Sequence, residues 1–333
     1  MNAATLSLED VIGNPNWFPD HMDFKRNLVG FVRTDRNALC RESFLDSRWN
    51  RSALPRIEIP IPTVLSASEK LPRPKLNILW HTAFCCSTLL ARCLDAEGAN
   101  LSLKEPQILI MLAEAKRAGR DVAAAVDATV KLLARGNEHV LVKPTNAVNN
   151  LIPEVLRATD GRMLFLYSDC KSFLVSIAKK GEMGRIFARK LFGLFAADGH
   201  PQTKWPWQTL FELSDMQIAA LVWHMQIAEL LRSRDAARSA ALNCDDFLGR
   251  PRETLEKLNA FFALDLSTSQ LDAALPLLAR NAKDTNEAFS ADRRAAEAED
   301  TARMFGTELD TVVEWSYRAC PETPRGNPLG STL

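Results

Sequence analysis

The stretch from Leu76 to Leu94 constrains the fold of this chain more than any other part of its sequence. It starts with the apolar run Leu-Asn-Ile-Leu-Trp-His, which is typical of a strand buried on both faces. A short loop follows at 82–86, and then Ser-Thr, a pair that favours the start of a helix. Because the first turn of a helix has unpaired backbone N–H groups and partial positive charge, this order predicts an anion-binding loop. The loop has neither glycine nor lysine, so it is not the GxxxxGK(S/T) phosphate loop.

Composition and charge limit the classes of protein to which the chain can belong. Its 333 residues suffice for one large α/β domain or two small ones, and 47% hydrophobic residues are ordinary for a soluble globular protein. A formal net charge of zero argues against broad nucleic-acid binding. The first residues lack a basic region followed by an apolar run, and no apolar stretch is long enough for a bilayer. We therefore expect neither a secretory signal nor a membrane span.

The seven cysteines indicate a reducing compartment. They are odd in number and irregularly spaced, and the adjacent Cys85 and Cys86 make a poor disulfide and no CxxC metal motif. We therefore expect a cytoplasmic protein. We also expect that it needs no metal, because backbone amides and cations can carry the negative charge of a bound anion.

From Leu76 onward, strand-like and helix-like segments alternate. Strands are expected at 76–81, 99–104, 139–143, 162–167 and 239–244, with helices between them and a helical cap at 183–234. This alternation predicts an α/β fold with a parallel sheet flanked by helices on both faces. Ligands in such sheets bind at the carboxyl ends of the strands. The loop at 82–88, Glu105, Lys143 and Ser168 are expected on that edge.

The first 70 residues lack this alternation. We expect helices at 27–35 and 37–49, and an edge strand or linker at 57–62, where prolines remove ladder donors. The predicted organisation is an amino-terminal extension packing on the core (1–70), an α/β domain that includes the cap (71–265), and a carboxy-terminal helical segment (266–333).

The order of these features resembles the sulfotransferases that use 3′-phosphoadenosine-5′-phosphosulfate (PAPS), proteins of P-loop-like fold. Their phosphosulfate loop, typically Pro-(Arg/Lys)-Ser-Gly-(Thr/Ser)-Thr, follows the first strand and leads into Leu-Leu. Here residues 83–90 read Ala-Phe-Cys-Cys-Ser-Thr-Leu-Leu. The Ser-Thr and Leu-Leu pairs match, whereas Phe84 replaces the basic residue and Cys86 replaces the glycine.

A second family element follows the fourth strand, where an Arg and a Ser eight positions later bind the 3′-phosphate. Ser176 has the required spacing, but Ser168 stands in the Arg position, and Lys171 can supply the charge instead. Leu-Lys-Glu-Pro at 103–106 resembles the Glu-Pro of many bacterial members, and 244–264 resembles their fifth-strand segment. The resemblance covers residues 76–265.

The resemblance implies a transferase that moves the sulfuryl group of PAPS to a hydroxyl or amine of a small-molecule acceptor and releases 3′-phosphoadenosine-5′-phosphate (PAP). With a net charge of zero we expect no nucleic-acid partner, and a homo-oligomer stays open. The residues expected to bind the nucleotide are Phe84, Cys85, Cys86, Ser87, Thr88, Ser168, Lys171 and Ser176.

Candidate catalytic residues lie on the same edge of the sheet. Glu105 is the first candidate for the general base that takes the acceptor proton, and His81 is its rival. A cation must stand near the leaving oxygen, and Lys104, Lys143 or Lys171 can replace the missing loop cation.

Each candidate has a structural alternative. Ser87 and Thr88 can be an ordinary N-cap pair, and Glu105 a helix cap or ion-pair partner. His81 can be a buried, satisfied histidine, and the lysines solvated surface charges. Cys85 and Cys86 can be reactive thiols, although small residues that let the loop curl are the preferred interpretation.

Two other functions stay open. One is an ATP-dependent kinase, which needs Mg²⁺ and could use Asp169 or Asp245, although the missing loop lysine counts against it. The other is a non-catalytic nucleotide-binding protein, which the lost loop cation and lost 3′-phosphate arginine favour.

Overall fold

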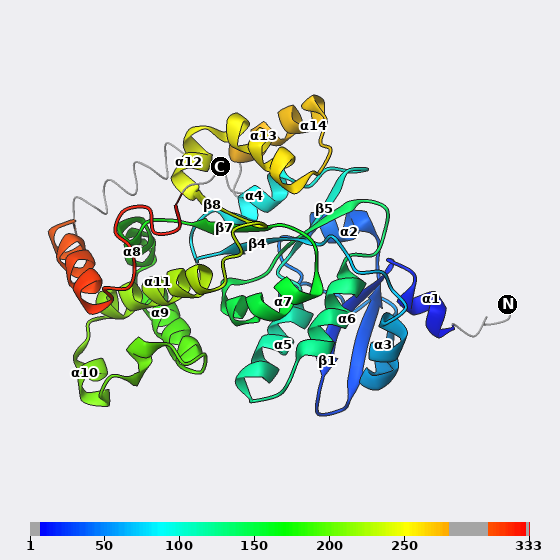
Figure 1. The fold of residues 1–333 in the computed structure, drawn as a ribbon, viewed down its shortest axis with the longest axis horizontal. Helices are drawn as coiled ribbons and strands as arrows, with labels where there is room; N and C mark the ends of the chain where they lie inside the picture. Colours follow the sequence, from blue (N-terminus) through cyan, green and yellow to red (C-terminus); the bar gives the residue numbers. More distant parts are fainter. Residues whose placement is uncertain (1–6, 280–305, 331–332) are drawn as a thin grey trace.

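The computed structural model describes residues 7–279, 306–330 and 333. Within them the core is a five-stranded parallel sheet with the strand order β5-β6-β4-β7-β8 (Figure 1). Its strands are β4 (Asn77–His81), β5 (Asn100–Lys104), β6 (His139–Lys143), β7 (Met163–Tyr167) and β8 (Ser239–Asn243). The predicted α/β class is confirmed.

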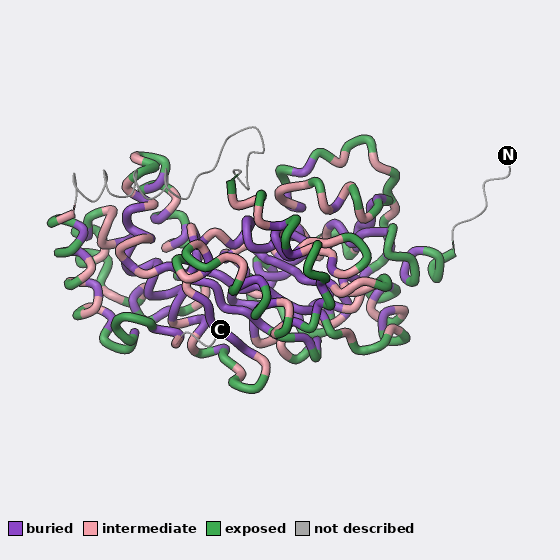
Figure 2. Tube along the Cα trace, turned by 90° about the horizontal axis from the view of Figure 1, so that it is seen from above, coloured by how far each residue is buried: buried purple, intermediate pink, exposed green. Residues whose placement is uncertain are grey.

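Helices cover both faces of this sheet, and this explains why its strands are apolar runs rather than alternating ones. On one face Leu79 and Leu164 pack against α4 (Ser87–Cys93), α13 (Pro251–Phe262) and α14 (Thr268–Ala274). On the other face Trp80 and Phe165 belong to a second core. That core includes α5 (Gln107–Arg117), α6 (Ala123–Leu133), α7 (Ile152–Ala158), α8 (Cys170–Lys179), α9 (Gly181–Ala196) and α11 (Asp215–Arg232). Figure 2 shows the buried residues concentrated along the sheet and its adjoining helices.

The strand order fixes the position of the candidate loop. Strand β4 is central, and both of its neighbours, β6 and β7, come later in the chain. The chain leaves β4 toward the face of α4, whereas it leaves β6 and β7 toward the opposite face. A crevice at the carboxyl ends of the strands forms where connections diverge in this way. Residues 82–86 therefore lie at the position where open α/β sheets bind ligands.

The amino-terminal region departs from the predicted helices. Strands β1 (Trp17–Asp23), β2 (Leu28–Arg33) and β3 (Arg56–Pro60) form an antiparallel sheet. The predicted helix at 27–35 is wrong because it is strand β2, whose Val29 and Phe31 are buried by partners distant in sequence. The predicted helix at 37–49 shrinks to α2 (Arg36–Arg41). The edge position predicted for 57–62 is confirmed, since β3 lies at the edge of the sheet.

The amino-terminal region is tied to the α/β core by hydrogen bonds. The Arg135 guanidinium donates to the carbonyl oxygens of four residues, Val11, Ile12, Asn14 and Trp17. The Leu45 N–H donates to the Lys104 carbonyl at 2.7 Å, and the Gln107 N–H donates to the Leu45 carbonyl at 3.0 Å. The segment around Leu45 therefore lies at the carboxyl end of β5. The predicted division of the chain at 70 and 265 stays a prediction.

The remaining elements lie around this frame. They are α1 (Leu8–Ile12), α3 (Ile61–Ser68), η1 (Asn146–Leu151), η2 (Pro201–Lys204), α10 (Trp207–Glu212), α12 (Cys244–Gly249) and η3 (Leu275–Ala279). A further helix spans 306–319, and its Ser316 bonds the ring of His224 in α11 at 2.9 Å. Of the segment predicted as helical at 266–333, residues 280–305 lie outside the described part. No helix among the described residues is both long and apolar enough to cross a membrane.

Candidate functional site

The loop between β4 and α4 adopts a curl that normally requires glycine. Phe84 and Cys86 have φ values of 62° and 61°, in the left-handed region that other residues seldom adopt. Such a conformation costs an L-residue roughly 1–2 kcal/mol. Cys86, which immediately precedes α4, stands where the resemblance expects glycine. Strain that persists in a loop at this position of the sheet is characteristic of functional sites.

Buried polar groups hold the first half of the loop. The Thr82 N–H donates to the Leu166 carbonyl at 3.0 Å. The Ala83 N–H donates to the side-chain oxygen of Gln226 in α11 at 2.9 Å, and the Asn146 amide donates to the same oxygen. Gln226 is almost fully buried, so these bonds are shielded from water.

The Cys85 thiol fills the inside of the curl. It donates to the Thr82 carbonyl at 2.9 Å, and the Ser87 N–H donates to its sulfur. Burial, with a smaller contribution from neighbouring Cys86, raises the pKa of Cys85 to about 11. The thiol is therefore protonated at neutral pH and is not a nucleophile. This arrangement agrees with Cys85 as a small loop-forming residue.

Ser87 and Thr88 begin α4 with buried side chains. Neither hydroxyl forms a hydrogen bond with another described residue, and no side chain caps this helix. The ordinary N-cap pair is therefore not the arrangement found.

Two more hydroxyls close to the loop lack partners. Thr82 Oγ1 and Ser168 Oγ are fully buried and unbonded in the described structure. They follow β4 and β7, which are adjacent strands. A buried hydroxyl without a partner is rare in native proteins, and it is the kind of group that a polar ligand satisfies.

Glu105 follows β5 in a left-handed conformation, with φ 56°. One carboxylate oxygen pairs with Lys143 Nζ, and the other accepts from Arg48 at 2.6 Å. Burial by itself raises the pKa of Glu105, but the charge and hydrogen bond of Lys143, together with the charge of Arg48, outweigh it, so the pKa lies below its ordinary value. Glu105 is thus an ionised carboxylate held between two cations. Its role as general base remains a prediction.

Arg48 is the residue that the sequence did not reveal. It lies in an irregular segment 57 residues before Glu105, where no motif marks it. Its guanidinium also pairs with Asp46 at 2.5 Å and lies 3.4 Å from the ring centre of Phe44.

The other predicted residues of the strand edge are buried and satisfied. Lys104 Nζ donates to the Cys40 carbonyl at 2.9 Å, and burial lowers its pKa. The two ring nitrogens of His81 lie 2.7 Å and 2.8 Å from the carbonyl oxygens of Thr82 and Pro144. Burial, followed by the charge of Lys143, lowers the pKa of His81 to about 3. The histidine is buried, as the structural alternative expected. The neutral ring donates one hydrogen bond, and its other nitrogen also faces a carbonyl oxygen, so neither nitrogen is open to an acceptor proton.

The predicted 3′-phosphate element lies at the start of α8. Lys171 pairs with Asp310 at 2.7 Å, and the Ser176 hydroxyl donates to the Ser172 carbonyl one turn earlier at 3.0 Å. Asp169 caps the helix by accepting from the Ser172 N–H at 2.8 Å. No group of acidic, histidine or cysteine side chains in the described part of the chain could hold a metal ion.

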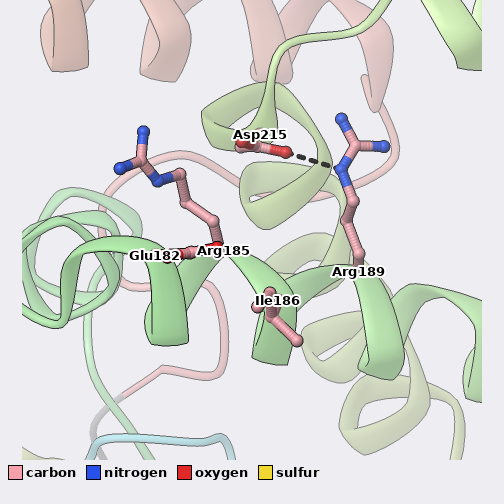
Figure 3. Close-up of a pocket in the computed structure, with 5 residues that line it drawn as sticks. All are labelled: Glu182, Arg185, Ile186, Arg189 and Asp215. Atoms are coloured by element: carbon pink, nitrogen blue, oxygen red, sulfur yellow. Dashed lines mark hydrogen bonds and ion pairs between the residues drawn. The ribbon is translucent and has the colours of Figure 1, made fainter.

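A separate surface hollow lies between α9 and the start of α11 (Figure 3). It is lined by Glu182, Arg185, Ile186, Arg189 and Asp215, and the Arg189 guanidinium pairs with Asp215 at 2.5 Å. None of the loop residues lines it. The hollow is therefore not part of the candidate site.

No protein-family model matches the chain, and no curated protein matches it. Among solved structures, it is similar to a sulfotransferase domain from the curacin biosynthetic pathway, with 14% identity over 74% of this chain and 98% of that one (TM-score 0.45). It is also similar to sulfotransferase STF9 from Mycobacterium avium, with 14% identity over 75% and 79% of the chains (TM-score 0.42). A third is mouse sulfotransferase SULT7A1 complexed with PAP, with 10% identity over 78% and 90% (TM-score 0.44).

All three structures carry the name of the class that the sequence resembles. At these identities and TM-scores, the likeness carries no weight in assigning a function to this chain. Any assignment has to rest on the loop and its surroundings.

Proposed function

We propose that this protein is a cytoplasmic sulfotransferase that binds PAPS at the loop 82–88 and sulfates a hydroxyl or amine of a small-molecule acceptor. The observation that carries the proposal is the curl at Phe84 and Cys86, kept without glycine, beside the unbonded hydroxyls of Ser87 and Thr88. A strained loop at the carboxyl end of the central strand is suited to surround an anion with donors.

The residues fit the nucleotide in part. The hydroxyls of Thr82 and Ser168 are buried donors without partners, as a phosphate or sulfate oxygen requires. Against the fit, Phe84 brings no charge to the loop. Lys171 already pairs with Asp310, and Ser176 bonds its own helix. Binding of a 3′-phosphate would have to break the Lys171–Asp310 pair, which is exposed and therefore weak.

The transfer would proceed in line. The acceptor oxygen or nitrogen attacks the sulfur, the bond from sulfur to the bridging phosphate oxygen breaks, and its electron pair leaves with PAP. The acceptor proton passes to Glu105. Since two cations hold Glu105 in the free protein, it becomes a competent base only when one of them moves. Arg48 is half-exposed and can move, whereas Lys143 is buried.

Thermal unfolding with and without ligands tests the proposal. A ligand that binds only the native state adds stability by mass action, about 2.7 kcal/mol at a hundredfold excess over Kd. We expect PAP and PAPS to raise the melting temperature, and ATP with Mg²⁺ to leave it unchanged. Absence of a shift with PAP and PAPS would refute the proposal, and a shift with ATP and Mg²⁺ alone would favour the kinase.

A second candidate function is a nucleotide-binding protein without catalysis. The ion pairs of Glu105 favour it, because a carboxylate with a lowered pKa is a poor base. Release of PAP from PAPS in the presence of a phenol or amine acceptor separates the two. If PAP is released, Glu105→Gln should still bind PAP and lose turnover, and retained turnover would exclude Glu105 as the base.

A further inference from the structure

We infer that Lys180, at the junction of α8 and α9, supplies the positive charge that the loop itself lacks and binds the 5′-phosphosulfate group. The inference rests on the proposed function. It adds a binding residue that lies outside the loop and outside the 3′-phosphate element.

The side chain of Phe84 links the loop to this junction. Its ring lies 5.8 Å from the ring of Phe173 in α8 and 5.4 Å from the ring of Phe187 in α9, between centroids. Lys180 Nζ lies 5.6 Å from the centre of the same Phe84 ring. The ammonium group is therefore held against the loop residue that stands where the resemblance expects a cation.

Two glycines fix the position of Lys180. The chain reverses at Gly181, whose φ of 55° is left-handed. At Gly184 a Cβ would lie 2.2 Å from the Ile177 carbonyl oxygen, so α8 and α9 approach too closely for any side chain there. This close packing sets Lys180 at the turn between the helices and brings Phe187 onto Phe84.

The charge of Lys180 is available to a ligand. Its side chain is exposed and forms no ion pair with the residues that the structure describes. The lysines that the sequence offered are occupied, since Lys143 pairs with Glu105, Lys171 with Asp310, and Lys104 donates to a carbonyl. Lys180 also lies four residues after Ser176, which places the two one helical turn apart.

Favourable interaction with the end of α8 is the simpler explanation for a lysine at this position. That role needs only the charge near the last carbonyls, and Lys179 provides it equally well. It does not require the ammonium group to lie over Phe84. The two explanations therefore differ in what happens when each lysine is removed.

The test compares Lys180→Ala with Lys179→Ala in the full chain, with affinity for PAP and for adenosine 5′-phosphosulfate as the readout. A charge-assisted hydrogen bond is worth enough to change Kd by roughly tenfold or more. We expect Lys180→Ala to weaken both ligands by about that factor, and Lys179→Ala to stay within about twofold of the wild type. Unliganded melting temperatures confirm that both variants fold.

A restored loop cation sharpens the test. Phe84→Lys in the Lys180→Ala background should recover most of the lost affinity, because it returns the charge to the loop. Equal affinities of the two lysine variants would overturn the inference and leave the proposed function intact. A loss of affinity confined to PAP would show that Lys180 binds the 3′-phosphate instead, and this result would also overturn the inference. A wild-type protein that binds neither ligand would instead refute the proposed function, and the inference with it.

Discussion

Charged side chains lie on two sides of the loop at 82–88. The strand side is formed by the carboxyl ends of β4, β5 and β6, and the helix side by the junction of α8 and α9. The two sides differ in whether these charges have partners. On the strand side, Lys143, Glu105 and His81 are buried, and each polar atom that could act faces a partner. On the helix side, Lys180 is exposed and lies over an aromatic ring. The strand side holds more of the residues that the sequence nominated for catalysis. The helix side holds Lys180, which forms no ion pair with another described residue.

Burial explains this difference. A charge removed from water must be paired inside the protein, because unpaired burial costs several kcal/mol. Lys143, at the end of β6, is therefore ion-paired, and Lys104, at the end of β5, is hydrogen-bonded to a carbonyl oxygen. A surface lysine can stay unmatched at little cost, so it is the better source of charge for a ligand.

Removal of Lys143 should destabilise the protein more than any other single substitution around the loop. Lys143→Met leaves Glu105 buried with Arg48 as its remaining partner, and we expect a loss of about 3–5 kcal/mol in the free energy of unfolding. Urea denaturation measures it. The double variant Lys143→Met/Glu105→Gln removes both charges and should regain much of the loss. If Lys143→Met is as stable as the wild type, the ion pair with Glu105 does not stabilise the strand side.

The stability of the strand side should depend on pH through His81. Its pKa falls from 6.5 in the unfolded chain to about 3 in the fold, so the unfolded state binds the extra proton between these values. Stability is therefore full above pH 6.5 and declines as the pH falls toward 3. His81 contributes a loss of roughly 2 kcal/mol between pH 7 and 5. Burial also lowers the pKa of His224, to about 4, which acts in the same direction.

Urea denaturation between pH 7 and 5 tests this dependence. His81→Gln should make the dependence of stability on pH weaker over this range. A wild-type curve that is flat over this range would contradict the burial of neutral histidines.

The smallest effect is expected at Cys86, between the two sides. Cys86→Gly removes the cost of a left-handed backbone at a residue with a Cβ. Glycine also makes the unfolded chain more flexible, which offsets part of this gain. The net gain in the free energy of unfolding should be about 0.5–1 kcal/mol. Cys86→Ala keeps the Cβ and should gain nothing, which makes it the matched control. A destabilised glycine variant would show that the Cys86 side chain, rather than the backbone curl, holds the loop.

The sequence predicted the α/β core well because its signals are local. The apolar run at His139–Lys143 coincides with β6, and the other four predicted strands differ by one residue at an end. Each is buried on both faces, so the apolar run is visible without knowledge of the neighbours. The amino-terminal sheet was missed because the burial of Val29 and Phe31 depends on pairing with β1 and β3.

The strand, loop and helix around the candidate site follow the predicted order, whereas the partners of the nearby charged side chains were not predicted. Residues 82–88 do connect the central strand to a helix. Glu105, Lys104 and His81 do lie at strand ends, but Glu105 and Lys104 have partners from distant segments, Arg48 and Cys40 among them. Lys180 follows Lys179 in the sequence, and no pattern indicated its approach to Phe84.

The sequence by itself determined the strand, loop and helix at 77–93 and the alternation that surrounds them, since apolar runs and helix starts depend on neighbouring residues. The tertiary structure decided which charges around that loop are available to a ligand. Availability depends on burial and on partners that are distant in the sequence, such as Lys143 and Arg48, which lie 38 and 57 residues from Glu105. It also decided that Phe84 and Cys86 adopt a curl that their side chains disfavour, because contacts from β7 and α11 hold the loop in place.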